Sequence, residues 1–350
     1  MNKVMSLIIF CIISFNSFAS LELGEAAMDR EDYVTAKAIF EPLAAEENAG
    51  AIFYLATLYD QGLGVDTNRQ KAVVLFTQAA ELNLPWAQYN LGISYYYGEG
   101  VEQSFELAFK WLLKAAEQGV ESAYDIVGLM YSRGEGVTKN VAEMVKWYQA
   151  AVEAEASSGN ITYVLASMYY NGSEIPKDLA LAVKYFSIAA KQGDPDAQYS
   201  LALLYSEGEG LEQSNQKSMK WLLAAASQHF TDAQFYLGMI YSAGEIVKKD
   251  AKASCDWYQL AADKGHEIAQ FRVAGCFLTG KGKEPNYELS AYYFQLAAEQ
   301  GLADAQNLLG VMHYQGIGMQ IDYVEAKKWL TMAAKQGHVK AQARLTNLNK

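Results

Sequence analysis

The stretch Ala87–Val101, AQYNLGISYYYGEGV, decides the fold because it returns along the chain with little change. Looser copies begin at Ala51, Ala123 and Ile161. Successive copies start 36 residues apart, except for one step of 38, where two residues are inserted within Glu153–Asn160. A fixed period of this length predicts a stack of equivalent structural units. The close copies begin at Ala197 (AQYSLALLYSEGEGL), Ala233 (AQFYLGMIYSAGEIV), Ala269 (AQFRVAGCFLTGKGK) and Ala305 (AQNLLGVMHYQGIGM).

Four further columns follow the same period and predict two helices per unit, helix A and helix B. A glycine ends helix A, where it tolerates a left-handed backbone, and a polar cap starts helix B. A large side chain and then an alanine let helix B pack closely. The glycines are Gly62, Gly98, Gly134, Gly172, Gly208, Gly244, Gly280 and Gly316. The caps are Asn68, Ser104, Asn140, Asp178, Ser214, Asp250, Asn286 and Asp322. The large residues are Leu75, Trp111, Trp147, Tyr185, Trp221, Trp257, Tyr293 and Trp329. The alanines are Ala79, Ala115, Ala151, Ala189, Ala225, Ala261, Ala297 and Ala333.

The combined pattern, A-Q-Y-x-L-G-x-x-Y-x-x-G-x-G-V and then W-x-x-x-A-A-x-x-G, resembles the Sel1-like repeat, a relative of the tetratricopeptide repeat. Eight such repeats cover residues 51–340, with starts at 51, 87, 123, 161, 197, 233, 269 and 305. Residues 20–48 resemble a shorter tetratricopeptide-like unit, and residues 341–350 are expected to form a capping helix. The resemblance implies an all-α fold, a right-handed α/α superhelical solenoid of about nine helix-turn-helix repeats. Glu174 and Ile246 replace the second loop glycine, so altered loops are expected there.

The composition excludes several protein classes. The 350 residues include 40 Asp and Glu against 28 Lys and Arg, a net charge of −12. Such a chain lacks the basic surface that nucleic-acid binding requires, so we expect no nucleic-acid partner. With 51% hydrophobic residues it can bury a core and is not a disordered acidic segment.

Residues Met1–Ala19 have the features of a secretory signal peptide. Lys3 supplies a positive charge, residues 4–18 are uncharged, and Ser17 and Ala19 place small side chains before a cleavage site at Ser20. An uncleaved anchor is the alternative, although the apolar stretch is shorter than the ~20 residues that a membrane span needs. We therefore expect cleavage after Ala19 and a periplasmic or secreted protein with no stable membrane span.

The sequence predicts no catalytic or metal site and no cofactor. Three of the four histidines, His229, His266 and His338, fall near the ends of helix B, where a donor side chain would suit exposed carbonyls. The fourth, His313, lies in helix A, and none is four residues from another, as a helical metal site would need. The Gly-x-Gly loops follow helices rather than strands, and no lysine completes a P-loop, so we interpret them as helix ends and not as phosphate cradles. We expect a protein that is not an enzyme.

Cys255 and Cys276 allow two interpretations. Both stand in columns that are otherwise apolar, as buried thiols do. Alternatively they form a disulfide, because helix B of the sixth repeat and helix A of the seventh should be antiparallel, with a turn near Gly265. The cysteines lie ten residues before and eleven residues after this glycine, so they should stand at similar heights on adjacent helices. An oxidising compartment would permit the bond.

Aromatic residues follow one predicted face of helix A. By analogy with tetratricopeptide superhelices, the third position of helix A points into a concave groove, and the position seven residues later lies on the same face. Rings with a polar group suit contacts with peptides or saccharides, whereas the alternative is packing between repeats. The candidate partner-binding residues are Phe53, Tyr89, Tyr96, Tyr163, Tyr170, Tyr199, Phe235, Phe271 and Tyr314.

Acidic residues gather in the loops of the second to sixth repeats. They form either a solvated rim or an acidic loop edge that steers a basic partner. The seventh repeat reverses the sign with Lys281 and Lys283. The residues of this edge are Glu99, Glu135, Glu174, Glu207, Glu209 and Glu245.

The resemblance implies an exported scaffold or adaptor that binds partner proteins through its concave face, in envelope assembly, signalling control or host interaction. The sequence leaves a second hypothesis open, a protein that binds peptidoglycan or another polysaccharide through its groove aromatics, with weak hydrolase activity. Recovery of a stoichiometric protein partner would favour the first function, and retention on polysaccharide would favour the second.

Overall fold

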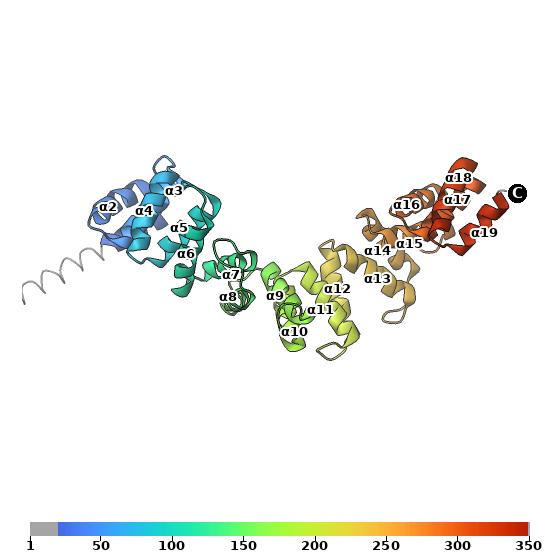
Figure 1. The fold of residues 1–350 in the computed structure, drawn as a ribbon, viewed down its shortest axis with the longest axis horizontal. Helices are drawn as coiled ribbons and strands as arrows, with labels where there is room; N and C mark the ends of the chain where they lie inside the picture. Colours follow the sequence, from blue (N-terminus) through green and yellow to red (C-terminus); the bar gives the residue numbers. More distant parts are fainter. Residues whose placement is uncertain (1–19, 349–350) are drawn as a thin grey trace, which may run out of the picture. The chain divides into compact units, whose positions relative to one another are not determined.

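A computed structural model describes residues 20–348, and the predicted signal peptide lies outside this range. All the regular elements within it are helices, which confirms the all-α prediction (Figure 1). Residues 20–29 are helical and pair with α2 (Tyr33–Ala45), and α19 (Val339–Leu348) follows the repeats.

Each of the eight repeats contains the two predicted helices. Helix A is formed by α3 (Ala49–Gln61), α5 (Pro85–Tyr97), η1 (Glu121–Ala123) with α7 (Tyr124–Arg133), α9 (Gly159–Asn171), α11 (Pro195–Glu207), α13 (Thr231–Ala243), α15 (Glu267–Thr279) and α17 (Ala303–Gln315). Helix B is formed by α4 (Arg69–Glu81), α6 (Phe105–Glu117), α8 (Val141–Glu153), α10 (Leu179–Lys191), α12 (Asn215–Ser227), α14 (Ala251–Asp263), α16 (Tyr287–Glu299) and α18 (Tyr323–Lys335).

The chain divides into two compact units, Met1–Ile161 and Thr162–Lys350. The division falls beside the two-residue insertion, where α8 ends at Glu153 and α9 begins at Gly159. Within each unit, successive helices pack side by side along the chain. This arrangement of helix pairs is that of the predicted solenoid.

The predicted caps and glycines delimit the helices as expected. The side chain of Asn68 accepts a hydrogen bond from the backbone N–H of Lys71 at 2.9 Å, and the seven equivalent caps make the same contact. At the end of helix A, Gly62 has a φ of +72°, and the other glycines of its column lie between +67° and +79°. The repeated alanine of helix B is 0% exposed in all eight repeats, which brings neighbouring helices into close contact.

The second loop glycine is a contact between neighbouring repeats. A Cβ atom placed on Gly136 would lie 2.0 Å from the carbonyl oxygen of Phe105, at the start of the preceding helix B. Gly100, Gly282 and Gly318 meet the equivalent backbone at 2.1–2.5 Å. Glu174 and Ile246 replace this glycine, and neither has a positive φ. The backbone of their two loops therefore differs from that of the other repeats, as predicted.

A ladder of glutamines joins the repeats and was not anticipated from the sequence. The glutamine at the second position of helix A, for example Gln270, is buried and donates to the carbonyl of Ala262 in the preceding helix B. Its own carbonyl accepts from Gln300, which also donates to Gly265 O. The two glutamines therefore satisfy the buried amide of Gln270 and bond to two backbone carbonyls of the preceding repeat. Equivalent side-chain pairs are Gln88–Gln118, Gln198–Gln228 and Gln306–Gln336.

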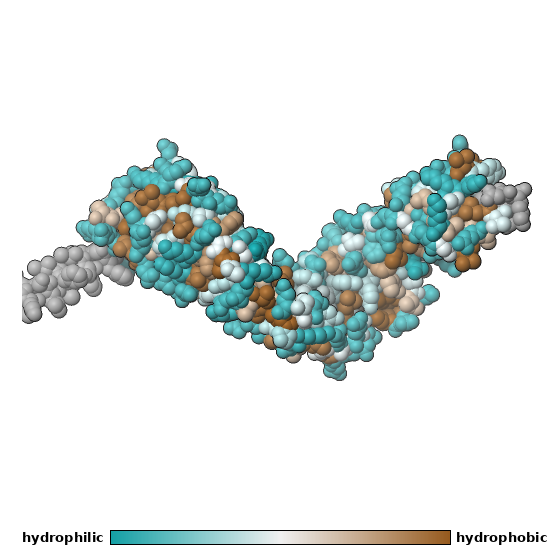
Figure 2. All heavy atoms as spheres, viewed as in Figure 1, coloured by the Kyte–Doolittle hydropathy of each residue, from teal (hydrophilic) through white to brown (hydrophobic). Residues whose placement is uncertain are grey.

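Exposed hydrophobic residues occur on helices of both units. Figure 2 shows brown hydrophobic patches interspersed with teal hydrophilic side chains in both units. Of the helices that the structure describes, none combines the length and hydrophobicity of a membrane span.

Candidate partner-binding face

The candidate site is the face of helix A that carries the predicted aromatic residues, here called the helix-A face. Its third-position rings are half-buried and pack against the core rather than projecting freely. Phe53 contacts Phe76 with ring centroids 5.9 Å apart, and Tyr163 contacts Phe186 at 5.7 Å. Because both partners are the equivalent residue of helix B, these rings hold the two helices of a repeat together. The remaining third-position contacts include Tyr89–Trp86, Tyr199–Phe230, Phe235–Tyr258 and Phe271–Phe294.

Two tyrosines of this face bond to the acidic loop edge. The hydroxyl of Tyr96 donates to Glu135 at 3.0 Å, and that of Tyr170 donates to Glu209 at 2.9 Å. The pKa of both tyrosines is raised. Burial is the main cause for Tyr96, and the hydrogen bond to Glu209 is the main cause for Tyr170. Both pairs are 39 residues apart, one period plus three, so this spacing was the signal in the sequence that could have predicted them. Tyr314, at the equivalent position, is exposed and packs edge-on against Tyr323.

The acidic loop edge is partly neutralised within the chain. Glu99 lies 3.5 Å from Arg69, Glu135 lies 3.6 Å from Arg133, and Glu209 lies 3.4 Å from Lys177. The exposed members are Glu99, Glu174, Glu207 and Glu245. The edge is therefore a set of local ion pairs, two of which join neighbouring repeats, as well as a source of negative charge.

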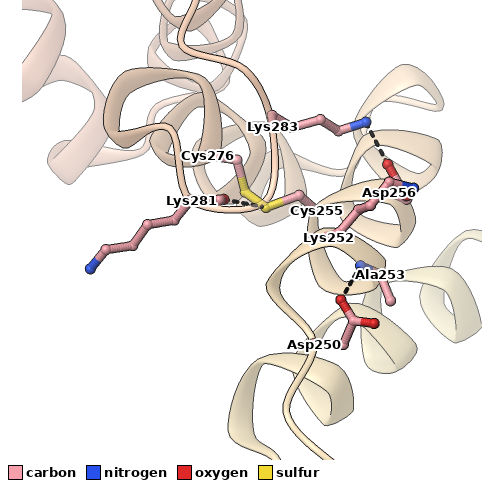
Figure 3. A network of polar contacts seen from close by, with 8 residues as sticks. All are labelled: Asp250, Lys252, Ala253, Cys255, Asp256, Cys276, Lys281 and Lys283. Carbon is pink, nitrogen blue, oxygen red and sulfur yellow. Dashed lines mark hydrogen bonds and ion pairs between the residues drawn. A yellow bond between two sulfur atoms is a disulfide. The ribbon is translucent and has the colours of Figure 1, made fainter.

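The seventh repeat replaces these contacts with a disulfide and a reversed ion pair (Figure 3). Cys255 of α14 is bonded to Cys276 of α15, with Cα atoms 6.2 Å apart. In the loop that follows α15, Lys283 lies 2.6 Å from Asp256. Lys283 holds the pKa of Asp256 below its ordinary value. The positive charge of this loop thus forms an ion pair with an acidic residue of the preceding helix B.

A pocket of about 290 Å³ opens on the helix-A face of the second unit, between α9, α10 and α11. Its apolar wall consists of Tyr163, Phe186, Leu203 and Leu204. Its polar wall consists of Ser167, Tyr170, Asn171, Ser200 and Glu207. The pocket thus brings together two predicted tyrosines and one residue of the acidic loop edge, which neither column of the sequence could show alone.

The rings of this pocket do not form an open platform. Tyr170 meets Phe186 edge-on at 6.3 Å, and the ammonium of Lys177 lies 5.0 Å from the centre of the Tyr170 ring. Saccharide stacking needs a free ring face, so this geometry does not favour the polysaccharide hypothesis.

Two of the histidines have a different role from the one predicted. His266 and His338 do not donate to the end of helix B; their Nδ1 atoms accept hydrogen bonds from Ala269 and Ala341, at the start of the next helix, both at 3.2 Å. A second pocket, of about 380 Å³, adjoins His338 and includes Phe271. Residues 20–348 contain no group of three or more His, Cys, Asp or Glu side chains that could hold a metal ion.

Stacked helix pairs with caps, loop glycines and buried alanines at a fixed period define an α-solenoid of short repeats. The Sel1 repeat family matches residues 49–84, 87–120, 122–155, 162–194, 195–230, 231–266, 268–302 and 303–338, so the chain belongs to that family. Sel1 repeat proteins are non-enzymatic scaffolds that bind protein partners.

Two solved structures resemble the whole chain. One is a protective antigen present in uropathogenic Escherichia coli strains, which displays an SLR fold; it is 29% identical, with a TM-score of 0.69, and the match covers 96% of this chain and 80% of the antigen. The other is a Sel1 repeat protein from Oxalobacter formigenes, 32% identical with a TM-score of 0.64, covering 95% of this chain and 93% of that protein. No curated protein matches the sequence.

Proposed function

We propose that this protein is an exported adaptor that binds partner proteins through its helix-A face, with the pocket between α9, α10 and α11 as a principal contact. The observation that carries the proposal concerns the hydrogen bonding of the polar side chains that line the pocket. The side chains of Ser167, Asn171, Ser200 and Glu207 make no hydrogen bond or ion pair within residues 20–348. They line the pocket together with apolar side chains, and such a combination orients a bound ligand.

The similarity to a protective antigen supports export and a role in host interaction. The disulfide supports export as well, since such bonds persist in oxidising compartments. We expect the mature chain to begin at Ser20, with both cysteines oxidised. Mass spectrometry of the protein from cell envelope and medium measures both properties. An intact Met1 or two free thiols in the exported fraction would contradict this part of the proposal.

Photocrosslinking in the producing cells tests the binding face. A benzoylphenylalanine at Asn171, on the rim of the pocket, should capture a defined protein partner. The same residue at Gln216, exposed on helix B, serves as the control. Equal capture from both positions, or capture of glycan in place of protein, would overturn the assignment of the helix-A face.

A further inference from the structure

The chemistry of the pocket between α9, α10 and α11 specifies more than a protein partner. Its volume of about 290 Å³ lies at the lower limit of ligand pockets, which range over roughly 300–1,000 Å³. A site of this size takes one long side chain or a very small ligand. Since the helix-A face is where we place the partner, the natural occupant is a side chain of that partner.

The charge of the pocket favours a cationic side chain. Glu207 is the single charged residue that lines it, and this exposed carboxylate forms no ion pair within residues 20–348. The amide of Asn171 and the hydroxyls of Ser167 and Ser200 add acceptors on the same wall. An acidic side chain would be repelled by Glu207, and an apolar one would cover these polar groups without satisfying them.

The protein already holds an ammonium group in this way beside the pocket. Lys177 lies 5.0 Å from the centre of the Tyr170 ring and 3.4 Å from Glu209. An aromatic ring and a carboxylate together stabilise a cation more than either does alone. Inside the pocket, Tyr163 and Phe186 supply aromatic surface and Glu207 supplies the carboxylate.

We propose that this pocket binds a lysine or arginine side chain of the partner protein, with its aliphatic stem against Tyr163 and Phe186 and its charged end at Glu207 and Asn171. The inference rests on the proposed function and adds the class of residue that is recognised. It also gives the acidic loop edge a local role, because Glu207 acts in one pocket rather than through the field of the whole edge.

Peptide display on the full chain provides the first test. Random dodecamer peptides are selected against the wild type and against Ser200→Tyr, whose larger side chain fills the pocket. We expect the wild type to enrich peptides with a recurrent lysine or arginine and Ser200→Tyr to lose that enrichment. Circular dichroism verifies that the variant keeps its helices.

A matched series then isolates the charge. An enriched peptide is compared with its norleucine analogue, which keeps the aliphatic stem but lacks the ammonium. Glu207→Gln should weaken the binding of the basic peptide about fivefold, which is the scale of a partly solvated ion pair. The affinity for the norleucine analogue should stay unchanged. Glu245→Gln makes the same charge change elsewhere on the acidic loop edge and should have no effect.

The outcomes separate the two proposals. Peptides that bind the helix-A face with equal affinity for lysine and norleucine would overturn the cation pocket and leave the adaptor function standing. Equal losses in Glu207→Gln and Glu245→Gln would also overturn it, because the whole edge would then be responsible. Failure to select any peptide, together with binding of a glycan at Asn171, would overturn both.

Discussion

Lys264 interrupts the glutamine ladder at the junction of the sixth and seventh repeats. It stands 30 residues after Gln234, at the position that Gln300 occupies relative to Gln270. The buried carbonyl oxygen of Gln234 consequently has no hydrogen-bond partner in the structure, whereas its amide still donates to Ala226. A single residue thus leaves one buried acceptor, the side-chain oxygen of Gln234, unsatisfied at this junction.

Lys264→Gln should therefore stabilise the protein by about 1 kcal/mol, the net value of one buried hydrogen bond. The new amide would donate to Gln234 Oε1, as Gln300 does to Gln270. Urea unfolding measures the change. In a double-mutant cycle, the gain should vanish on a Gln234→Leu background, and a gain that persists there would show that another contact causes it.

Asp125 occupies the third helix A position of the third repeat, where most repeats have a ring. Its carboxylate accepts a hydrogen bond from the backbone N–H of Ser158, within the segment that contains the two-residue insertion, at 3.3 Å. Burial is the main cause that raises the pKa of Asp125 above its ordinary value. The folded state therefore prefers the protonated carboxyl.

The sign of the pH dependence follows from this preference. The contribution of Asp125 to stability is fully present below the unfolded pKa, near 3.8, and is lost as pH rises through the raised folded pKa. Asp125→Asn, which has no titrating charge, should be more stable than the wild type at neutral pH and lose that advantage at pH 3. Thermal unfolding across this range measures it. A constant difference at every pH would exclude titration of Asp125 as the cause.

At the scale of elements, the second loop glycine lets the loop of one repeat lie against helix B of the preceding repeat. Gly136→Ala should destabilise the first unit by roughly 2 kcal/mol beyond the strain of a positive φ, since the new methyl overlaps the backbone of α6. Gly119→Ala is the control: its φ is also positive, but a Cβ there meets nothing within 4 Å. We expect only the strain, roughly 1–2 kcal/mol, at Gly119. Equal losses in urea unfolding would show that the loop contact contributes nothing.

At the scale of the whole molecule, the disulfide belongs to one compact unit. Cys255 and Cys276 both lie in Thr162–Lys350 and enclose a short loop, so the bond should stabilise this unit by about 3 kcal/mol. We expect Cys255→Ser/Cys276→Ser to increase hydrogen exchange in α14, α15 and their neighbours, and to leave α3–α7 unchanged. Exchange that rises equally in both units would mean that the chain unfolds as one cooperative body.

The sequence by itself determined the repeats, because cap chemistry, glycine φ and alanine packing act within a few residues of one another. Asn68, Gly62 and Ala79 each perform in the structure the role that their column predicted. The aromatic face was also visible as a pattern, although the choice between binding and packing was not. The columns indicated residue types, and these carry no information on which neighbour each side chain meets.

Only the tertiary structure decided those contacts. It paired Tyr170 with Glu209 and gathered Tyr163, Ser200 and Glu207 around one pocket. These residues come from two neighbouring repeats, and their distances depend on how the repeats pack in three dimensions. Local sequence fixes hydrogen bonds between residues three or four apart, whereas contacts across 30 or more residues depend on the packing of whole repeats.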